Sequence, residues 1–350
     1  MQRLLLISIA ITIGAATSPA LPPPFAQAIQ HPHLMIVVEK GLPGATLYDA
    51  DTDQPICDAK SGAMSPHEAA FSPNGRIVYL PIYGSTNIGV PGTNEHAIEF
   101  FSTSDCKKVG SLETGEYLRP HGAWAGGSGT LYVTSELAQS ILLIDPRQRK
   151  IVAAIPTGSR WTHMLAVTSD EKRAFASNTR SKTISVLDIP DRKILKTIAT
   201  TSANHRLAIS PDGKWFVTSL EEGKVLFYRA SDDSLDFSVP VDGWAFVGKF
   251  AADGLYYEMG SGSPHTSKSW GTGPVRVWKI YPKTRKVMLA ATDDLGAGTG
   301  SLAINPFNHE IYVSAMVNNQ IDVIDPITLR VLKRLPTQKT PDCIEFAAVQ

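Results

Sequence analysis

Short apolar runs separated by turn residues recur along almost the whole chain. The clearest unit spans residues 120–157, in which the apolar runs 131–135, 141–145 and 151–155 are separated by polar turns. Each run is too short for a helix and is rich in aliphatic residues, many of them β-branched, so each run predicts a strand. Together with the inner segment 120–124, they make four strands in about 40 residues, which is the pattern of one β-propeller blade.

The same pattern returns at a fixed step along the chain. His121, His163 and His205 each open an inner segment, and the step between them is constant (163 − 121 = 42 and 205 − 163 = 42). Such a step predicts four-stranded blades, and counting them predicts an all-β fold, a seven-bladed β-propeller that forms one domain over residues 29–350. Residues 341–347 have the inner-strand pattern but no blade of their own. We expect this C-terminal strand to complete the first blade and close the ring.

Several strands and turns resemble those of a known repeat family. Leu131-Tyr132-Val133-Thr134-Ser135, Phe216-Val217-Thr218-Ser219 and Ile311-Tyr312-Val313-Ser314 resemble the Tyr-Val-Thr-Asn strand of that family, and Ser-Pro-Asn/Asp-Gly turns occur at 72–75 and 210–213. The chain is therefore similar to YVTN/YncE-like seven-bladed propellers over nearly its whole length after the N-terminal segment. The resemblance implies the fold, but such propellers serve as enzymes, electron-transfer subunits, metal carriers and binding scaffolds, so the function stays open.

Residues 1–28 have the composition of a signal peptide. Arg3 precedes the apolar core 4–16, and Ala26-Gln27-Ala28 has the small-x-small pattern of a cleavage site. This core is too short to span a bilayer comfortably, although a membrane anchor is the alternative interpretation. The segment predicts a periplasmic or secreted protein, and no later stretch is apolar enough to cross a membrane.

The charge of the chain excludes one class of partner. The sequence has 33 Lys and Arg against 33 Asp and Glu and contains no basic run, so nucleic acid is a poor candidate. We expect a monomer that binds a small molecule, a metal ion or a periplasmic protein.

The three cysteines are compatible with an oxidising compartment. Cys57 and Cys106 both lie near outer strands of their predicted blades, where they either form a bridge between neighbouring blades or stay unpaired. Cys343 is expected to be buried beside the innermost strand.

The starts of the inner strands supply candidate ligands. The first strand of each blade lines the channel, so residues at the same offset form a ring, which consists of Asp342, His67, His121, His163, His205, Phe246 and Gly300. Neutral imidazoles that face one space are common ligands of Zn²⁺ and Cu²⁺, and a carboxylate can complete the set. This predicts a divalent metal, Zn or Cu, with the ligands His67, His121, His163, His205 and Asp342. The alternative is that a Pro-His opening is a repeat feature, with ring nitrogens bonded to backbone carbonyls between blades.

Further polar side chains are expected at the same mouth of the channel. Two long loops, 84–96 and 260–273, join second to third strands and overhang this mouth, and the later loop contains Trp270. Long loops of this kind in a compact fold are often functional. The predicted ligand-binding residues are His67, His121, His163, His205, Arg206, Glu136 and Trp270.

The sequence carries none of the common catalytic motifs. There is no Gly-x-Ser-x-Gly elbow, Walker loop, His-Glu-x-x-His or Cys-x-x-Cys-His. The leading interpretation is an exported binding protein that holds a ligand or metal at a His-lined channel mouth. One alternative is a lactonase- or lyase-type enzyme that uses a channel His as acid/base and Arg206 as oxyanion partner. Another is a protein-interaction scaffold.

Overall fold

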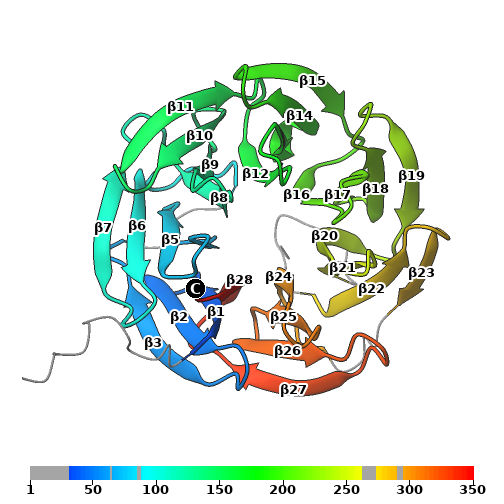
Figure 1. Ribbon diagram of the computed structural model, residues 1–350. Helices are drawn as coiled ribbons and strands as arrows, with labels where there is room; N and C mark the ends of the chain where they lie inside the picture. The colour runs from blue at the N-terminus through cyan, green and yellow to red at the C-terminus, as the bar shows by residue number, and fades with distance from the viewer. Residues whose placement is uncertain (1–30, 64, 85–87, 262–272, 290–294) are drawn as a thin grey trace, which may run out of the picture. The chain divides into compact units, whose positions relative to one another are not determined.

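Seven four-stranded antiparallel sheets form a ring around a central channel (Figure 1). The computed structural model describes residues 31–63, 65–84, 88–261, 273–289 and 295–350. Within these ranges the only helical element is one short 3-10 turn, η1 (Thr179–Ser181), and no helix is long and apolar enough to cross a membrane. The structure confirms the predicted all-β, seven-bladed propeller.

Each blade begins with an inner strand at the channel and ends with an outer strand at the rim. From the channel outward, the strands are, in blade one, β28 (Pro341–Ala348), β1 (His33–Glu39), β2 (Gly44–Asp49) and β3 (Pro55–Lys60); in blade two, β4 (Ala70–Phe71), β5 (Ile77–Ile82), β6 (Ala97–Ser102) and β7 (Lys108–Glu113); in blade three, β8 (Pro120–Ala125), β9 (Leu131–Ser135), β10 (Ser140–Asp145) and β11 (Lys150–Pro156); in blade four, β12 (Thr162–Val167), β13 (Arg173–Asn178), β14 (Thr183–Asp188) and β15 (Lys193–Ala199); in blade five, β16 (Asn204–Ile209), β17 (Trp215–Leu220), β18 (Lys224–Arg229) and β19 (Leu235–Pro240); in blade six, β20 (Trp244–Phe250), β21 (Tyr256–Ser261), β22 (Val275–Tyr281) and β23 (Lys286–Leu289); and in blade seven, β24 (Thr299–Ile304), β25 (Ile311–Ala315), β26 (Gln320–Ile324) and β27 (Val331–Pro336).

The two ends of the propeller chain meet in blade one. Strand β28 pairs with β1 in antiparallel register, with Leu34 opposite Ala347 and Ile36 opposite Glu345. This confirms the predicted closure by the C-terminal strand. Closure matters because it supplies the inner strand of blade one and leaves no blade with an open inner edge.

The hydrophobic core lies between neighbouring blades, which pack face to face. Phe175 of blade four stacks on Phe216 of blade five, with ring centroids 4.1 Å apart. The middle strands β9 and β10 are buried almost throughout, whereas the outer strand β15 is mostly exposed. Burial on both faces explains why the middle strands are nearly continuous apolar runs in the sequence.

A disulfide joins blades one and two. Cys57 of β3 is bonded to Cys106, in the turn between β6 and β7, and their Cα atoms are 5.9 Å apart. Of the two alternatives that the sequence left open, the structure shows the bridge. Cys343 is buried, as predicted, and lies within the inner strand β28 itself.

Each inner strand contains a β-bulge where the predicted ring residues lie. In β12, His163 falls between two aligned pairs of residues at a register shift, and Phe246 does the same in β20. The register also shifts at the matching positions of β8, β16, β24 and β28. A bulge changes the direction of the side chains that it carries. The shared bulge therefore explains why residues at one offset of the repeat gather at the channel.

A Thr or Ser in the second strand supports the bulge. The Thr134 hydroxyl accepts a hydrogen bond from the Gly122 N–H at 2.8 Å and donates one to the carbonyl of His163, in the next blade, at 2.7 Å. Ser177 makes the equivalent bond to the carbonyl of His205 at 2.7 Å. Thr134 is the threonine of the Tyr-Val-Thr-Asn-like strand, so this motif has a structural role in tying the inner strands of adjacent blades together.

Candidate ligand-binding site in the channel

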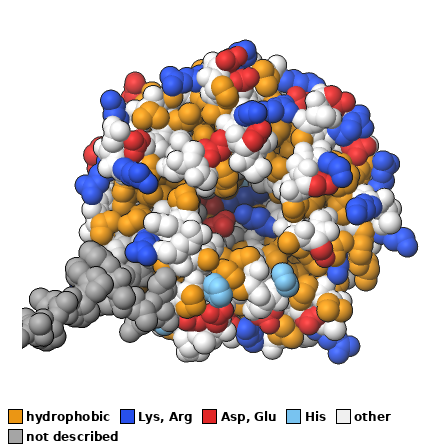
Figure 2. Space-filling model, viewed as in Figure 1, with side chains coloured by type: hydrophobic (Ala, Val, Ile, Leu, Met, Phe, Trp, Pro, Cys, Tyr) orange, Lys and Arg blue, Asp and Glu red, His pale blue; other side chains and the backbone are white. Residues whose placement is uncertain are grey.

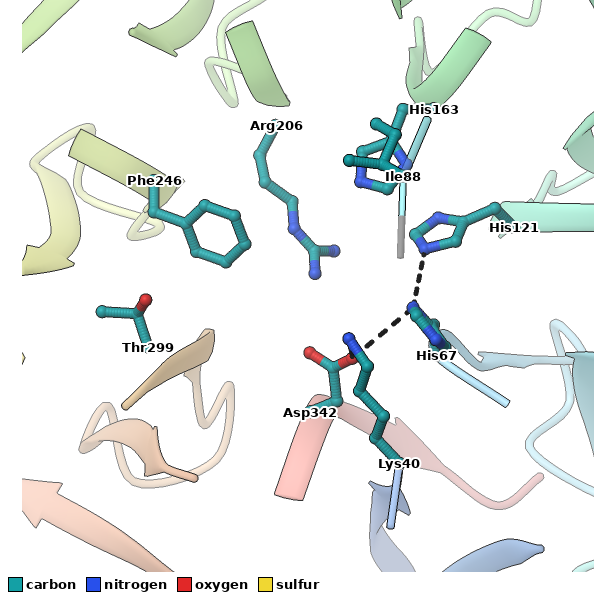
Figure 3. A pocket seen from close by; sticks show the side chains of 9 residues that line it. All are labelled: Lys40, His67, Ile88, His121, His163, Arg206, Phe246, Thr299 and Asp342. Carbon is teal, nitrogen blue, oxygen red and sulfur yellow. Dashed lines mark hydrogen bonds and ion pairs between the residues drawn. The ribbon is translucent and has the colours of Figure 1, made fainter. Parts of the chain in front are cut away.

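A small cavity lies in the channel beside the bulges. Its volume is about 20 Å³, which accommodates one or two water-sized groups. Its wall consists of Lys40, His67, Ile88, His121, His163, Arg206, Phe246, Thr299 and Asp342 (Figure 3). All seven blades contribute to this wall. The cavity therefore forms only when the ring is closed.

Three of the four predicted histidines meet at this cavity. Nε2 of His121 lies 3.3 Å from Nδ1 of His67, and the rings of His121 and His163 have centroids 4.0 Å apart. Nδ1 of His67 is also 3.8 Å from a carboxylate oxygen of Asp342. Four of the five residues predicted as metal ligands thus line one cavity.

These three imidazoles are neutral at physiological pH. Burial lowers the pKa of His67, His121 and His163 well below the usual range, and neighbouring imidazoles and the positive charges of Lys40 and Arg206 lower it further. A neutral imidazole carries one N–H donor and one nitrogen lone pair. The cluster is therefore suited to hydrogen-bond a polar ligand or to coordinate a metal ion.

The fourth histidine, His205, is not part of the cavity wall. Its Nε2 lies 2.7 Å from a carboxylate oxygen of Glu221, and its ring packs 5.1 Å from that of Phe246. Burial lowers the pKa of His205, although the nearby Glu221 raises it. The next residue, Arg206, lines the cavity instead. Both residues belong to the bulge of β16, and only one of them contributes to the wall.

Arg206 points toward the centre of the channel (Figure 3). Its Nη1 lies 2.6 Å from a carboxylate oxygen of Glu68, and its guanidinium lies 5.6 Å from the ring centroid of Phe246. Nζ of Lys40 is 3.7 Å from a carboxylate oxygen of Asp342. In Figure 2, acidic and basic side chains lie together at the floor of the central hollow. The channel thus contains both signs of charge in close pairs.

Glu136, predicted as a ligand-binding residue, lies behind the cavity wall. It accepts a hydrogen bond from Nη1 of Arg119 at 3.0 Å and another from the hydroxyl of Tyr83, and its second oxygen is 4.0 Å from Nδ1 of His163. Burial raises the pKa of this carboxyl, and the bonds from Tyr83 and Arg119 lower it. In this position Glu136 anchors its neighbours and does not line the cavity.

Several site residues were not selected from the sequence. Lys40, Tyr83 and Glu221 directly follow the second strand of their blades, as Glu136 does. Because second strands end at the mouth where inner strands begin, strand direction was a signal that could have identified them. Ile88 lies in a loop and has no repeat position, so no comparable signal exists for it. Trp270 lies outside the described residues, as does most of its loop.

The predicted metal ligands fit an ion only in part. His121 Nε2 and His67 Nδ1 are 3.3 Å apart, close to the separation of about 3.3 Å expected for two nitrogens on one tetrahedral zinc. Within the described ranges, however, no three His, Cys, Asp or Glu side chains are arranged to hold a metal ion. The described side chains therefore supply a pair of nitrogens at a suitable distance without a complete ligand set, and the zinc or copper site stays a prediction.

The fold and the cavity define a seven-bladed β-propeller with a buried polar site in its channel. A family model described as "YNCE-like beta-propeller" matches residues 119–236, about a third of the chain. Together with the seven blades, this match confirms the predicted family resemblance. A comparison with curated proteins found no match.

Several solved structures have a similar fold. A putative 6-phosphogluconolactonase from Bacteroides uniformis is 13% identical, with a TM-score of 0.70, and the alignment covers 90% of this chain and 99% of that one. The periplasmic gluconolactonase of Pseudomonas aeruginosa is 13% identical, with a TM-score of 0.69 and coverage of 91% and 100%. Hydrazine synthase of Kuenenia stuttgartiensis is 18% identical, with a TM-score of 0.63 and coverage of 79% and 88%. At these identities the likeness shows the fold alone.

Proposed function

We propose that the protein is a binding protein that holds a small polar ligand or a metal ion in the channel cavity. The observation that carries the proposal is a set of buried polar atoms in the cavity-lining residues. His67 Nε2, Arg206 Nε and Thr299 Oγ1 are buried and have no hydrogen-bond partner among the described residues. Buried polar atoms in native proteins are nearly always hydrogen-bonded. Their presence around one cavity supports a role in holding a ligand.

The size of the cavity favours binding over lactonase-type catalysis. A lactonase must accommodate the ring of its substrate, whereas a volume of about 20 Å³ admits only one or two water-sized groups. The gluconolactonases among the similar structures support the fold, and their low identity carries no activity over to this chain. A small ligand held among neutral imidazoles is the function that this geometry supports best.

Export to the periplasm is part of the proposal. The disulfide between Cys57 and Cys106 supports an oxidising compartment, because such bonds persist there and are rare in the cytosol. The predicted signal peptide, residues 1–28, lies outside the described residues. N-terminal sequencing of the protein recovered from the periplasm is expected to begin after Ala28. A chain recovered in the cytoplasm and still beginning at Met1 would argue against export.

The binding function is tested by analysing what the purified protein releases. The untagged protein is denatured, and the released metals and small molecules are quantified by elemental analysis and mass spectrometry. The His67→Gln/His121→Gln variant removes the pair of nitrogens 3.3 Å apart without changing charge. His309→Gln is the control, because His309 is exposed and lies outside the cavity wall.

We expect one species near equimolar amount from the parent and the His309 control, and much less from the double variant. Zn²⁺ or Cu²⁺ as that species would establish the predicted metal site. If the parent releases nothing, and neither these metals nor small polar probes such as formate bind to it in a titration, the proposed function is wrong.

A further inference from the structure

We propose that Ile88 decides which molecules reach the channel cavity and that Arg119 is the positioning residue that holds it there. The inference rests on the proposed function, because it concerns access to the same cavity. Ile88 is 4% exposed and lines the cavity, whose other walls are mostly polar. In Figure 3 its side chain lies beside His163, close to the imidazole cluster. An aliphatic side chain in this position limits the size of a polar ligand without offering it a hydrogen bond.

The backbone around Ile88 is held by side chains of two other blades. The carbonyl of Ile88 accepts a hydrogen bond from Nη2 of Arg180 at 3.3 Å, and the N–H of Gly89 donates to Glu136 at 3.4 Å. The carbonyl of Val90 accepts a shorter bond, 2.8 Å, from Nη2 of Arg119. Three consecutive residues are therefore fixed from outside their own blade. This arrangement holds Ile88 in the cavity through its backbone.

Arg119 links this segment to the propeller with all of its guanidinium nitrogens. Besides the bond to Val90, Nε donates to the side-chain oxygen of Asn94 at 2.6 Å and Nη1 donates to Glu136 at 3.0 Å. Arg119 is 3% exposed and has a φ of 55°, immediately before β8. A planar guanidinium can satisfy three acceptors in fixed directions at once, whereas a lysine ammonium cannot reproduce that geometry.

Removing the charge of Arg119 would leave the buried Glu136 carboxylate without its cation, which is strongly destabilising. Arg119→Lys is the better test, because it keeps the positive charge beside Glu136 and loses the simultaneous bonds to Asn94 and Val90. Ile88→Ala tests the other half of the proposal, because it removes three carbons from the cavity wall and leaves the backbone contacts in place. Ile327→Ala is the matched control, since Ile327 is 85% exposed.

The experiment measures how fast a reagent reaches the buried imidazoles. The full-length protein is treated with diethyl pyrocarbonate at pH 7, and carbethoxylation of each histidine is followed by peptide mass spectrometry. Neutral imidazoles are the reactive form, so His67, His121 and His163 report access directly. The exposed His96 and His309 are internal references in the same sample.

In the parent, we expect the three cavity histidines to react far more slowly than His309. Ile88→Ala and Arg119→Lys should each accelerate their reaction by about tenfold or more, because labelling follows the population of open conformations. The rates at His96 and His309 should stay unchanged, and Ile327→Ala should match the parent throughout. Near-ultraviolet circular dichroism checks that each variant is folded.

Rapid labelling of the cavity histidines in the parent would overturn the proposal, and so would parental rates in a folded Ile88→Ala variant. If Arg119→Lys does not fold, Ile88→Ala and its control decide the outcome alone. The readout needs no ligand, so it fails separately from the proposed function. Release of a bound species together with unchanged labelling rates would keep the binding site and remove the role of Ile88.

Discussion

The two halves of the channel ring share one backbone and differ in chemistry. In blades two to four, the bulges carry His67, His121 and His163, whereas those of blades six and seven carry Phe246 and Gly300. We call these the imidazole half and the apolar half. Because the same register shift occurs in both, the repeat determines where a side chain points and leaves its chemistry free to vary. Function on this fold therefore depends on a few positions that the repeat does not constrain.

Packing makes part of this difference obligatory. A Cβ atom at Gly300 would lie 2.8 Å from the carbonyl oxygen of Pro341 and 2.4 Å from the Ser314 hydroxyl. No such contact restricts Phe246, which already carries a large side chain at the equivalent bulge. Blade seven is thus closed to an imidazole by the close approach of β28, whereas blade six is not.

The largest effect is expected from placing an imidazole in blade seven. Gly300→His should lower the free energy of unfolding by about 3 kcal/mol or more, because the backbone of β28 must move to admit the Cβ atom. Phe246→His is the comparison and should cost less, since its Cβ is already accommodated. Urea denaturation of both variants and the parent measures the difference. Equal stability of the two variants would show that close packing does not explain the apolar half.

The sequence was sufficient for the fold because each blade repeats the same local pattern. The 42-residue step between histidines located the inner strands, and the unpaired strand pattern at residues 341–347 located the closure. Strand number, blade count and the ring offset all depend on this local repetition. None of them requires knowledge of contacts between distant residues.

The details of the site were less predictable because they depend on contacts between blades. His205 and Arg206 are consecutive in one bulge, and no periodicity shows that Arg206 lines the cavity while His205 pairs with Glu221. The role of Ile88 depends on Arg119, which is 31 residues away in the chain (119 − 88 = 31). Such contacts are determined by tertiary packing, which a single sequence does not reveal.

A second prediction concerns a titratable group in the apolar half. Where Thr134 supports the bulge of blade three, Glu258 supports that of blade six by accepting a hydrogen bond from the Phe246 N–H at 2.9 Å. Burial raises the pKa of Glu258 from 4.5 to about 8, although hydrogen bonds from Ser219, Tyr256 and the Phe246 N–H lower it. The folded protein therefore keeps this proton at neutral pH, whereas the unfolded chain loses it.

The sign of the pH dependence follows from this difference in proton binding. Between about pH 4.5 and pH 8 the folded state binds the extra proton, so the stability contributed by this group falls by about 1.4 kcal/mol per pH unit as pH rises. Glu258→Gln cannot ionise and lacks this slope. From pH 4.5 to pH 7, the variant should gain about 3 kcal/mol relative to the parent.

Urea denaturation at several pH values measures the effect of Glu258→Gln. Glu113→Gln is the control, because the side chain of Glu113 is 66% exposed and its substitution should leave the pH profile unchanged. If the curves of Glu258→Gln and the parent run parallel across this range, Glu258 is ionised in the folded state and the interpretation is wrong.

The smallest effect is expected from the hydroxyls that support the bulges, and it separates the two halves most directly. Thr134→Val in the imidazole half and Ser314→Ala in the apolar half each remove an acceptor of a bulge N–H, at 2.8 Å from Gly122 and 2.6 Å from Ser301. Each loss should cost about 2 kcal/mol of unfolding free energy, because a buried N–H loses its partner. Only Thr134 also holds the carbonyl of His163. Thr134→Val should therefore accelerate carbethoxylation of His163, whereas Ser314→Ala should leave it at the parental rate. A similar acceleration in both variants would mean that the bulges move as one connected ring, and the chemistry of the imidazole half would then depend on the apolar half as well.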